Sequence, residues 1–158
     1  MSHSSLAHIQ SWQPFEETDH GITMLMLNGL SEKPAAELVP LAKSWLSPPP
    51  LEAVDRGFRS EGFDPTPRAY VVTRQGPSAL DALEVTLQAT PDSPAVHPAL
   101  LVRDWGLAQA RIEVDGQTAP ESKDVRVGHI HRLDGEDLVL WLRKETTQPM
   151  RISISPSR

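Results

Sequence analysis

The chain has 158 residues, 39% of them hydrophobic and 23% charged, and no apolar run approaches the about 20 residues that a membrane span requires. Its 15 Lys and Arg against 21 Asp and Glu give a formal net charge of -6, which disfavours nucleic acid and anionic membrane surfaces as partners. The chain has no cysteine, which excludes disulfides, thiolate nucleophiles and Cys-ligated metals. The 15 prolines, about twice the usual proportion, argue against a helix bundle.

The N-terminal part is predicted to hold a strand, a short helical segment and a connector. The apolar run at residues 22–27 is typical of a buried strand. Over residues 33–46 apolar side chains recur every three or four positions, which predicts a helix. Because Pro40 lacks a backbone donor, we expect either two short helical pieces or a helix that begins near Pro40. The prolines at 48–50 predict a stiff polyproline II connector.

The rest of the chain is predicted to be strands separated by turns. Residues 56–67 read as a polar loop, and beyond Pro67 apolar and polar residues alternate. Asp-Gly pairs at 115 and 134 predict tight turns, the second closing a hairpin. The predicted strands are 68–74, 83–89, 97–104, 111–115, 125–132, 137–143 and 151–155.

This pattern predicts a mainly β protein, an antiparallel immunoglobulin-like two-sheet β-sandwich with a short N-terminal helical segment. The predicted division is 1–50 for the N-terminal strand, short helix and Pro-rich connector, and 51–158 for the sandwich domain.

One group of residues suggests a metal site. His129 and His131 alternate along a predicted strand and Glu136 follows, so that two imidazoles on one strand face and a carboxylate nearby would suit a divalent metal. The spacing resembles the first motif of the cupin family, which implies a metal held inside a small β-barrel. The second motif of that family does not follow downstream, which disfavours the metal enzyme.

A structural alternative explains the same histidines without a metal. If Gly128 marks a β-bulge, then Val125, Val127 and Ile130 all face the core. The two histidines then lie on the outer face of the strand.

No complete catalytic set is found. The chain has no Gly-x-Ser-x-Gly elbow and no phosphate-binding glycine loop. A carboxylate pair for glycoside cleavage stays open, because the separation in space decides it. We therefore expect no enzymatic activity, no catalytic residue and no cofactor.

Tryptophans beside polar residues suggest a sugar-binding surface, because an indole ring can cover the apolar face of a pyranose. Trp105 follows Arg103 and Asp104 at a predicted strand end. With His129 and His131 these residues are the predicted ligand-binding set. Trp141 is expected to fill the core and Trp45 to pack the helical segment onto the sheet.

Three stretches, residues 98–106, 111–116 and 123–142, resemble the C-terminal β-sandwich appended to large bacterial proteins of polysaccharide breakdown. Residues 35–45 would then be the run-in from a preceding domain. The resemblance implies a non-catalytic accessory module with a polysaccharide or a neighbouring catalytic domain as its partner. It transfers no functional residue, since it is a pattern of strands and turns.

Two other function classes and the location stay open. The first class is the small cupin-like metal enzyme using His129, His131 and Glu136, and the second is a self-associating interaction domain. The first residues show no basic region followed by an apolar one, so they predict no secretory signal. We expect a cytoplasmic protein, or a secreted or periplasmic one if the chain belongs to a larger exported protein.

Overall fold

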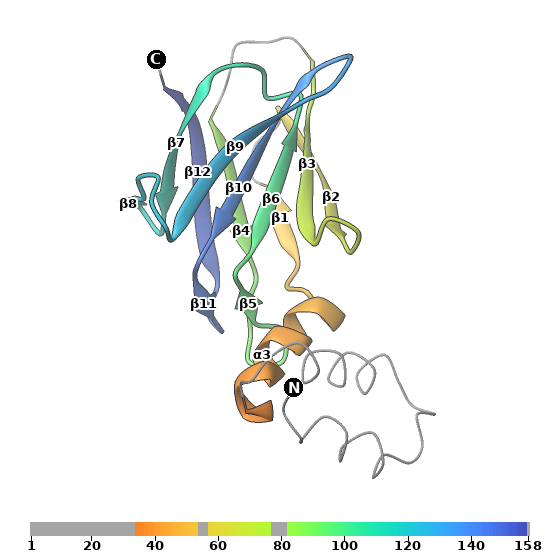
Figure 1. The fold of residues 1–158 in the computed structure, drawn as a ribbon, viewed down its shortest axis with the longest axis vertical. Coiled ribbons are helices and arrows are strands. Elements are labelled where there is room, and N and C mark those ends of the chain that lie inside the picture. The colour runs from red at the N-terminus through yellow and green to blue at the C-terminus, as the bar shows by residue number, and fades with distance from the viewer. Residues whose placement is uncertain (1–33, 54–56, 77–81, 158) are drawn as a thin grey trace.

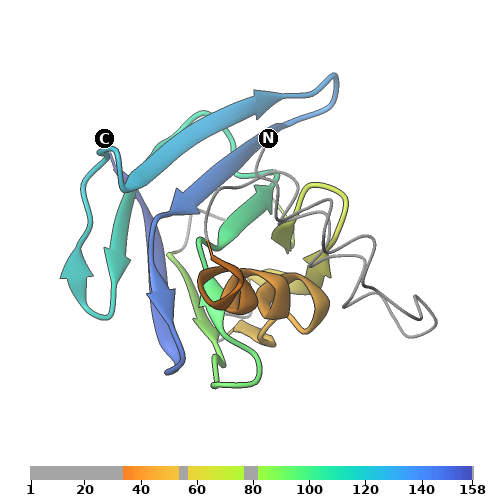
Figure 2. The ribbon, with the colours of Figure 1, turned by 60° about the horizontal axis from the view of Figure 1, so that its bottom comes forward.

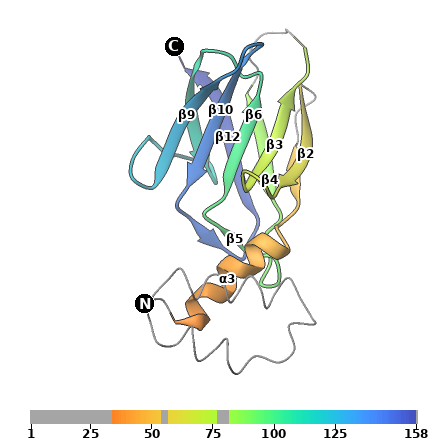
Figure 3. The same cartoon turned by 45° about the vertical axis from the view of Figure 1, so that its right-hand side comes forward.

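In the computed structural model, the described residues are 34–53, 57–76 and 82–157. They form a mainly β structure of two five-stranded sheets, one two-stranded sheet and one helix, α3. The two large sheets lie face to face, and α3 lies at one end of them, near the two-stranded sheet (Figures 1 and 3). The strand predicted at residues 22–27 falls outside the described residues.

The first large sheet is antiparallel throughout and has the strand order β1-β4-β12-β7-β8. Its strands are β1 (Leu51–Ala53), β4 (Leu83–Leu87), β7 (Gln109–Val114), β8 (Gln117–Thr118) and β12 (Met150–Ser157).

The second large sheet has the order β2-β3-β6-β10-β9. Its strands are β2 (Phe58–Asp64), β3 (Ala69–Arg74), β6 (Ala99–Arg103), β9 (Val125–His131) and β10 (Glu136–Leu142). The short strands β5 (Ala95–Val96) and β11 (Glu145–Thr146) pair with each other. All seven predicted strands are confirmed.

Alternate side chains of the two large sheets meet in one core. On β4, for example, Leu83, Val85 and Leu87 are fully buried, while the residues between them are half-buried. Each such side chain stabilises the fold by about 1.5–3 kcal/mol through its removal from water. The core residues that are no more than 3% exposed include Val72, Leu100, Val102, Ile112, Leu138, Leu140, Ile152 and Ile154.

The second sheet is mixed, so the predicted purely antiparallel arrangement is wrong for one pair of strands. β3 and β6 pair in parallel, with Val71 opposite Leu101. Parallel neighbours require a crossover connection. Here the chain leaves β3, runs through β4 of the opposite sheet and returns to β6 in the original direction.

The polar loop predicted at residues 56–67 is also wrong, because residues 58–64 form the edge strand β2. The backbone pairs with β3, and Phe58 is buried in the core, so tertiary contacts override a polar composition. The register shifts between Ser60 and Gly62, whose φ of 85° suits the bulge.

A single helix, α3 (Ala35–Leu46), runs through Pro40, so the predicted interruption is wrong. Leu38 and Ala42, on either side of Pro40 in the chain, are both buried on one face of the helix. Their burial outweighs the one backbone hydrogen bond that a proline removes. Figure 2 looks onto the end of the sheets that carries α3.

The predicted Asp-Gly turn at 115–116 is confirmed, whereas the second predicted turn is shifted by one residue to Leu133 and Asp134, because Gly135 pairs with Arg132. Asp115 and Gly116 have φ angles of 52° and 77° and join β7 to β8, as a two-residue turn with positive φ at both positions does. The second turn closes the β9–β10 hairpin, where the Arg132 N–H donates to the Gly135 carbonyl at 2.9 Å.

Candidate functional site

Trp105 is not available to a ligand, so its predicted role in sugar binding is wrong. Its side chain is 0% exposed and belongs to the core between the sheets. The indole Nε1–H donates to the Ala108 carbonyl at 2.9 Å. The chain turns inward after β6, where Asp104 and Gly106 both have positive φ angles of 59° and 90°. That turn carries the ring away from the surface.

Asp104 belongs to a charge cluster that ties the β9–β10 hairpin to the end of β6. Arg132 lies at its centre, with Nη2 2.6 Å from Asp104, Nε 2.9 Å from Asp137 and Nη1 3.1 Å from Asp134. Asp137 is buried and also accepts the Asp104 backbone N–H at 3.0 Å. The hydrogen bond that the Arg132 Nε–H donates to the Asp137 carboxylate, together with the charges of the three aspartates, outweighs desolvation and raises the pKa of Arg132. The role of Asp104 is therefore structural.

Arg103 is engaged by Glu61 across the second sheet. Its Nη1 lies 3.3 Å from the Glu61 carboxylate. The Thr73 hydroxyl donates to the same carboxylate at 2.6 Å, and this bond, helped by the charges of Arg103 and Arg59, lowers the pKa of Glu61 despite partial desolvation. Arg103 and Trp105 thus share no site.

The bulge predicted at Gly128 is absent, because β9 pairs with β10 in one unbroken register. Val127 and His129 therefore lie on the same, inner side of the strand, and Ile130 faces outward with 47% of its surface exposed. His129 Nε2 lies 3.2 Å from the Ala108 carbonyl that accepts from the buried indole. The prediction that places Ile130 in the core and His129 outside is wrong.

The three residues of the predicted metal site are only partly brought together. His131 forms an ion pair with Glu136, which is its cross-strand partner at the hairpin end. His129 is engaged with the Ala108 carbonyl instead. Within the part of the chain that the structure describes, no three His, Asp or Glu side chains converge as a metal site requires.

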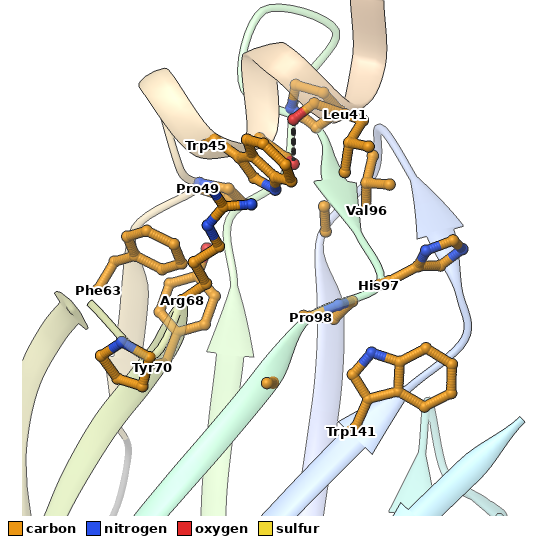
Figure 4. A pocket seen from close by; sticks show the side chains of 15 residues that line it. Leu41, Trp45, Pro49, Phe63, Arg68, Tyr70, Val96, His97, Pro98 and Trp141 are labelled. Atoms are coloured by element: carbon orange, nitrogen blue, oxygen red, sulfur yellow. Dashed lines mark hydrogen bonds between the residues drawn. The ribbon is translucent and has the colours of Figure 1, made fainter. Parts of the chain in front are cut away.

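Aromatic side chains gather instead in a pocket of about 330 Å³ between α3 and the adjoining end of the second sheet (Figure 4). This volume lies at the lower end of the range of small-ligand sites, about 300–1,000 Å³. We call it the tryptophan pocket. Its lining includes Trp45, Phe63, Arg68, Tyr70, His97 and Trp141.

The helix and the β2–β3 turn form one wall of the tryptophan pocket. The Arg68 guanidinium lies over the Trp45 ring, 3.4 Å from its centroid, and Figure 4 shows the arginine lying across the indole. Trp45 also packs against Leu38 and Ala42 of its own helix. Phe63 and Tyr70 meet edge to face at 5.2 Å, and burial raises the pKa of the Tyr70 phenol.

The other wall is built around Trp141. The prediction that Trp141 fills the core is wrong. Trp141 lies on the outer face of β10 and is half-buried, because the alternate residues Leu140 and Leu142 take the inner face. Its ring centroid is 5.9 Å from that of His97. Arg126, its cross-strand partner on β9, holds its guanidinium 5.4 Å from the same ring. His97 also pairs with Glu145 at 3.3 Å.

Two residues of the pocket have strained backbones. Among the described residues, four other than glycine have positive φ, and Arg68 (55°) and His97 (47°) both line the tryptophan pocket. Such conformations cost on the order of 1–3 kcal/mol each and cluster at binding and catalytic sites. The remaining two, Asp104 and Asp115, belong to the Arg132 cluster and to a hairpin turn.

A further hollow on the first sheet has a different character. It is lined by Glu84, Glu113, Asp115, Gly116, Arg151 and Ser153. Its carboxylates are already paired, Glu84 with Arg151 and Asp115 with Lys144. It contains no aromatic side chain, so it offers no stacking surface for a ring.

In comparisons with known proteins, no family model, curated protein or solved structure matches the chain. Among the described residues, no helix combines the length and the apolar composition needed to cross a membrane.

Proposed function

We propose that the chain is a non-catalytic accessory module of a carbohydrate-active protein that binds glycan weakly through the tryptophan pocket. The observation that carries this proposal is the pairing of two half-buried indoles, Trp45 and Trp141, with Arg68 and His97 in one pocket. The glycan site thus moves from the region of Trp105 to the end of the sheets that carries α3.

The chemistry of the pocket suits a sugar. A pyranose ring has an apolar face of C–H groups, which an indole covers, and a rim of hydroxyls, which need polar partners. Trp141 supplies a surface on a β-strand, and Arg68 supplies N–H donors from the opposite wall. The limited volume and the exposed position favour weak binding of a short stretch of polymer.

The finer assignment of the fold belongs to the same proposal. We assign the two large sheets to an immunoglobulin-like sandwich, supported by their common core and by a chain that repeatedly changes sheet. The parallel pairing of β3 with β6 departs from that pattern.

The test is calorimetric titration of the chain with polysaccharides selected on a glycan array. Trp141→Ala is expected to weaken binding about tenfold, which corresponds to the loss of one stacking surface. Val139→Ala is the matched control, because Val139 lies on the same face of β10 and does not line the pocket. Absence of binding to every glycan, or equal binding by Trp141→Ala and the unaltered chain, would refute the proposal.

A second candidate function, self-association, is favoured by the outer edge of β9, which pairs with no other strand in the described part of the chain. The Arg132 N–H donates to the Gly135 carbonyl, and the Arg143 N–H donates to the Asp124 carbonyl. In an antiparallel pair the bonded positions alternate, so the even-numbered residues of β9 bond to β10. Val127 and His129 therefore direct their backbone N–H and C=O groups outward, whereas those of Val125 are bonded to Ser122. The other edges of the large sheets are short, as in β1 and β8, or bulged, as in β2.

A long regular edge is a template for another strand. Antiparallel pairing of two copies of β9 about Gly128 would set Arg126 opposite Ile130 of the second copy, with no like charges facing. Val127→Pro removes an outward N–H without breaking the bonds to β10. Light scattering is expected to show a dimer for the unaltered chain and for the hairpin-tip control Leu133→Ser, and a monomer for Val127→Pro. A monomer for the unaltered chain contradicts this function.

A further inference from the structure

The charges around the tryptophan pocket differ from those on the rest of the molecule. Arg68 lies over the indole of Trp45, and the Arg126 guanidinium lies 5.4 Å from the ring centroid of Trp141. Among the described residues no carboxylate pairs with either arginine. Most other described arginines do pair with carboxylates: Arg59, Arg103, Arg111, Arg132, Arg143 and Arg151. The described lining of the pocket contains no Asp or Glu, and Glu145, which lies beside the pocket, is paired with His97.

These two cations remain able to bind an anion. A guanidinium stacked on a ring is covered on one face, whereas its N–H groups point outward in the plane of the group. That geometry is suited to two parallel hydrogen bonds with a carboxylate or a sulfate. In a chain whose net charge is -6, a locally positive pocket is selective, because the rest of the surface repels anionic polymers.

We propose that the ligand of the tryptophan pocket is an acidic polysaccharide. Its anionic substituent, a ring carboxylate or a sulfate ester, bonds to the Arg68 guanidinium, and its sugar ring lies against Trp141. Arg126 adds a second positive charge beside that ring from the neighbouring strand. This inference rests on the proposed glycan binding and specifies the class of glycan.

The position of Arg68 supports this assignment. The residue is exposed, lies directly after Pro67 in the β2–β3 turn, and is held with a φ of 55° that an arginine rarely adopts. The turn carries the side chain across Trp45 at the mouth of the pocket (Figure 4). This backbone conformation fixes the guanidinium over the Trp45 ring, in the lining of the pocket, where a ligand can reach its N–H groups.

The decisive experiment compares polymers that differ only in charge. The protein is titrated separately with polygalacturonate and with its methyl ester, and with dextran sulfate and with dextran. Each titration is made at low and at high salt. We expect the protein to bind at least one acidic polymer about tenfold more tightly than its neutral counterpart, an advantage that falls as salt rises. The polymer that is preferred distinguishes the carboxylate from the sulfate.

Variants separate a specific site from general charge. Arg68→Gln is expected to remove most of the preference for the acidic polymer and Arg126→Gln part of it. Arg111→Gln is the control, because it removes the same charge from the first sheet and leaves the pocket intact. Circular dichroism shows whether each variant is folded. If Arg68→Gln does not fold, Arg126→Gln still tests the proposal, because Arg126 lies on a different strand.

The outcomes distinguish the two proposals. Equal binding of charged and neutral polymers, abolished by Trp141→Ala, overturns the acidic ligand and leaves the glycan site. A loss with Arg111→Gln as large as with Arg68→Gln also overturns the acidic ligand, because the effect is then general charge. Absence of binding to all the polymers overturns both proposals.

Discussion

Replacing Trp105 with alanine is expected to lower the free energy of unfolding by about 4 kcal/mol, because it empties the space of a fully buried indole. The side chain is 0% exposed and is the largest of the fully buried side chains in the described residues. The change also leaves the Ala108 carbonyl without its indole donor. Urea denaturation followed by circular dichroism measures the loss.

Leu107→Ala is the matched control for Trp105→Ala. Leu107 lies two residues further along the same turn and is 73% exposed. Its replacement is expected to change the free energy of unfolding by less than about 0.5 kcal/mol. If the two variants were equally stable, Trp105 could not occupy the core, and its predicted role at a ligand site would return.

Removing the Asp137 carboxylate is expected to destabilise the protein by about 2 kcal/mol, since Asp137→Ala takes away two hydrogen-bond acceptors in a buried position. The Asp104 backbone N–H and the Arg132 Nε–H then lose their partner. Arg132 is one-third exposed, so water offsets part of the loss. The loss should be visible as a lower midpoint of thermal and urea unfolding.

Asp134→Ala provides the comparison, because Asp134 pairs with the same arginine but is 79% exposed. Surface ion pairs contribute about 0–1 kcal/mol, so this variant should behave almost as the unaltered chain does. A loss of stability with Asp134→Ala as large as with Asp137→Ala would mean that burial does not govern this cluster.

The Arg132 cluster and the tryptophan pocket serve different ends of the molecule. The cluster joins the β9–β10 hairpin tip to the end of β6, whereas the pocket lies beside α3 at the opposite ends of β6 and β10. Variants of the cluster should therefore alter stability and leave glycan binding unchanged. Variants of Arg68 should do the reverse, since its side chain is exposed.

Local patterns in the sequence are sufficient for seven of the strands and for most of the turns between them. Strict alternation of apolar and polar residues, as around Leu83, Val85 and Leu87, predicts a strand because one face of the strand is buried and the other is nearer to solvent. The Asp-Gly pair at 134 predicts the hairpin, and the hairpin register places Arg126 opposite Trp141. That pairing was the available signal for the pocket. The high average burial of tryptophan favours a core position for Trp141, yet Trp141 alternates with three buried leucines and so lies on the other face of the strand.

Other features depend on contacts between distant segments. The parallel pairing of β3 with β6, the strand β2 and the unbroken helix through Pro40 all arise from tertiary packing, which outweighs local preference. Trp105 lies in the core because two residues with positive φ turn the chain inward, and no short pattern encodes that turn.

The sequence by itself thus determined the β class, the seven strands with clear alternation and the β9–β10 hairpin, because alternation and turn chemistry act within about ten residues. Only the tertiary structure decided which aromatic residues share a site. Trp45, Arg68, His97 and Trp141 come from a helix, a turn, a loop and a strand that meet where α3 packs at the end of the sheets. Their proximity depends on how whole helices and strands pack together, and the periodicity of a short segment contains no information about that packing.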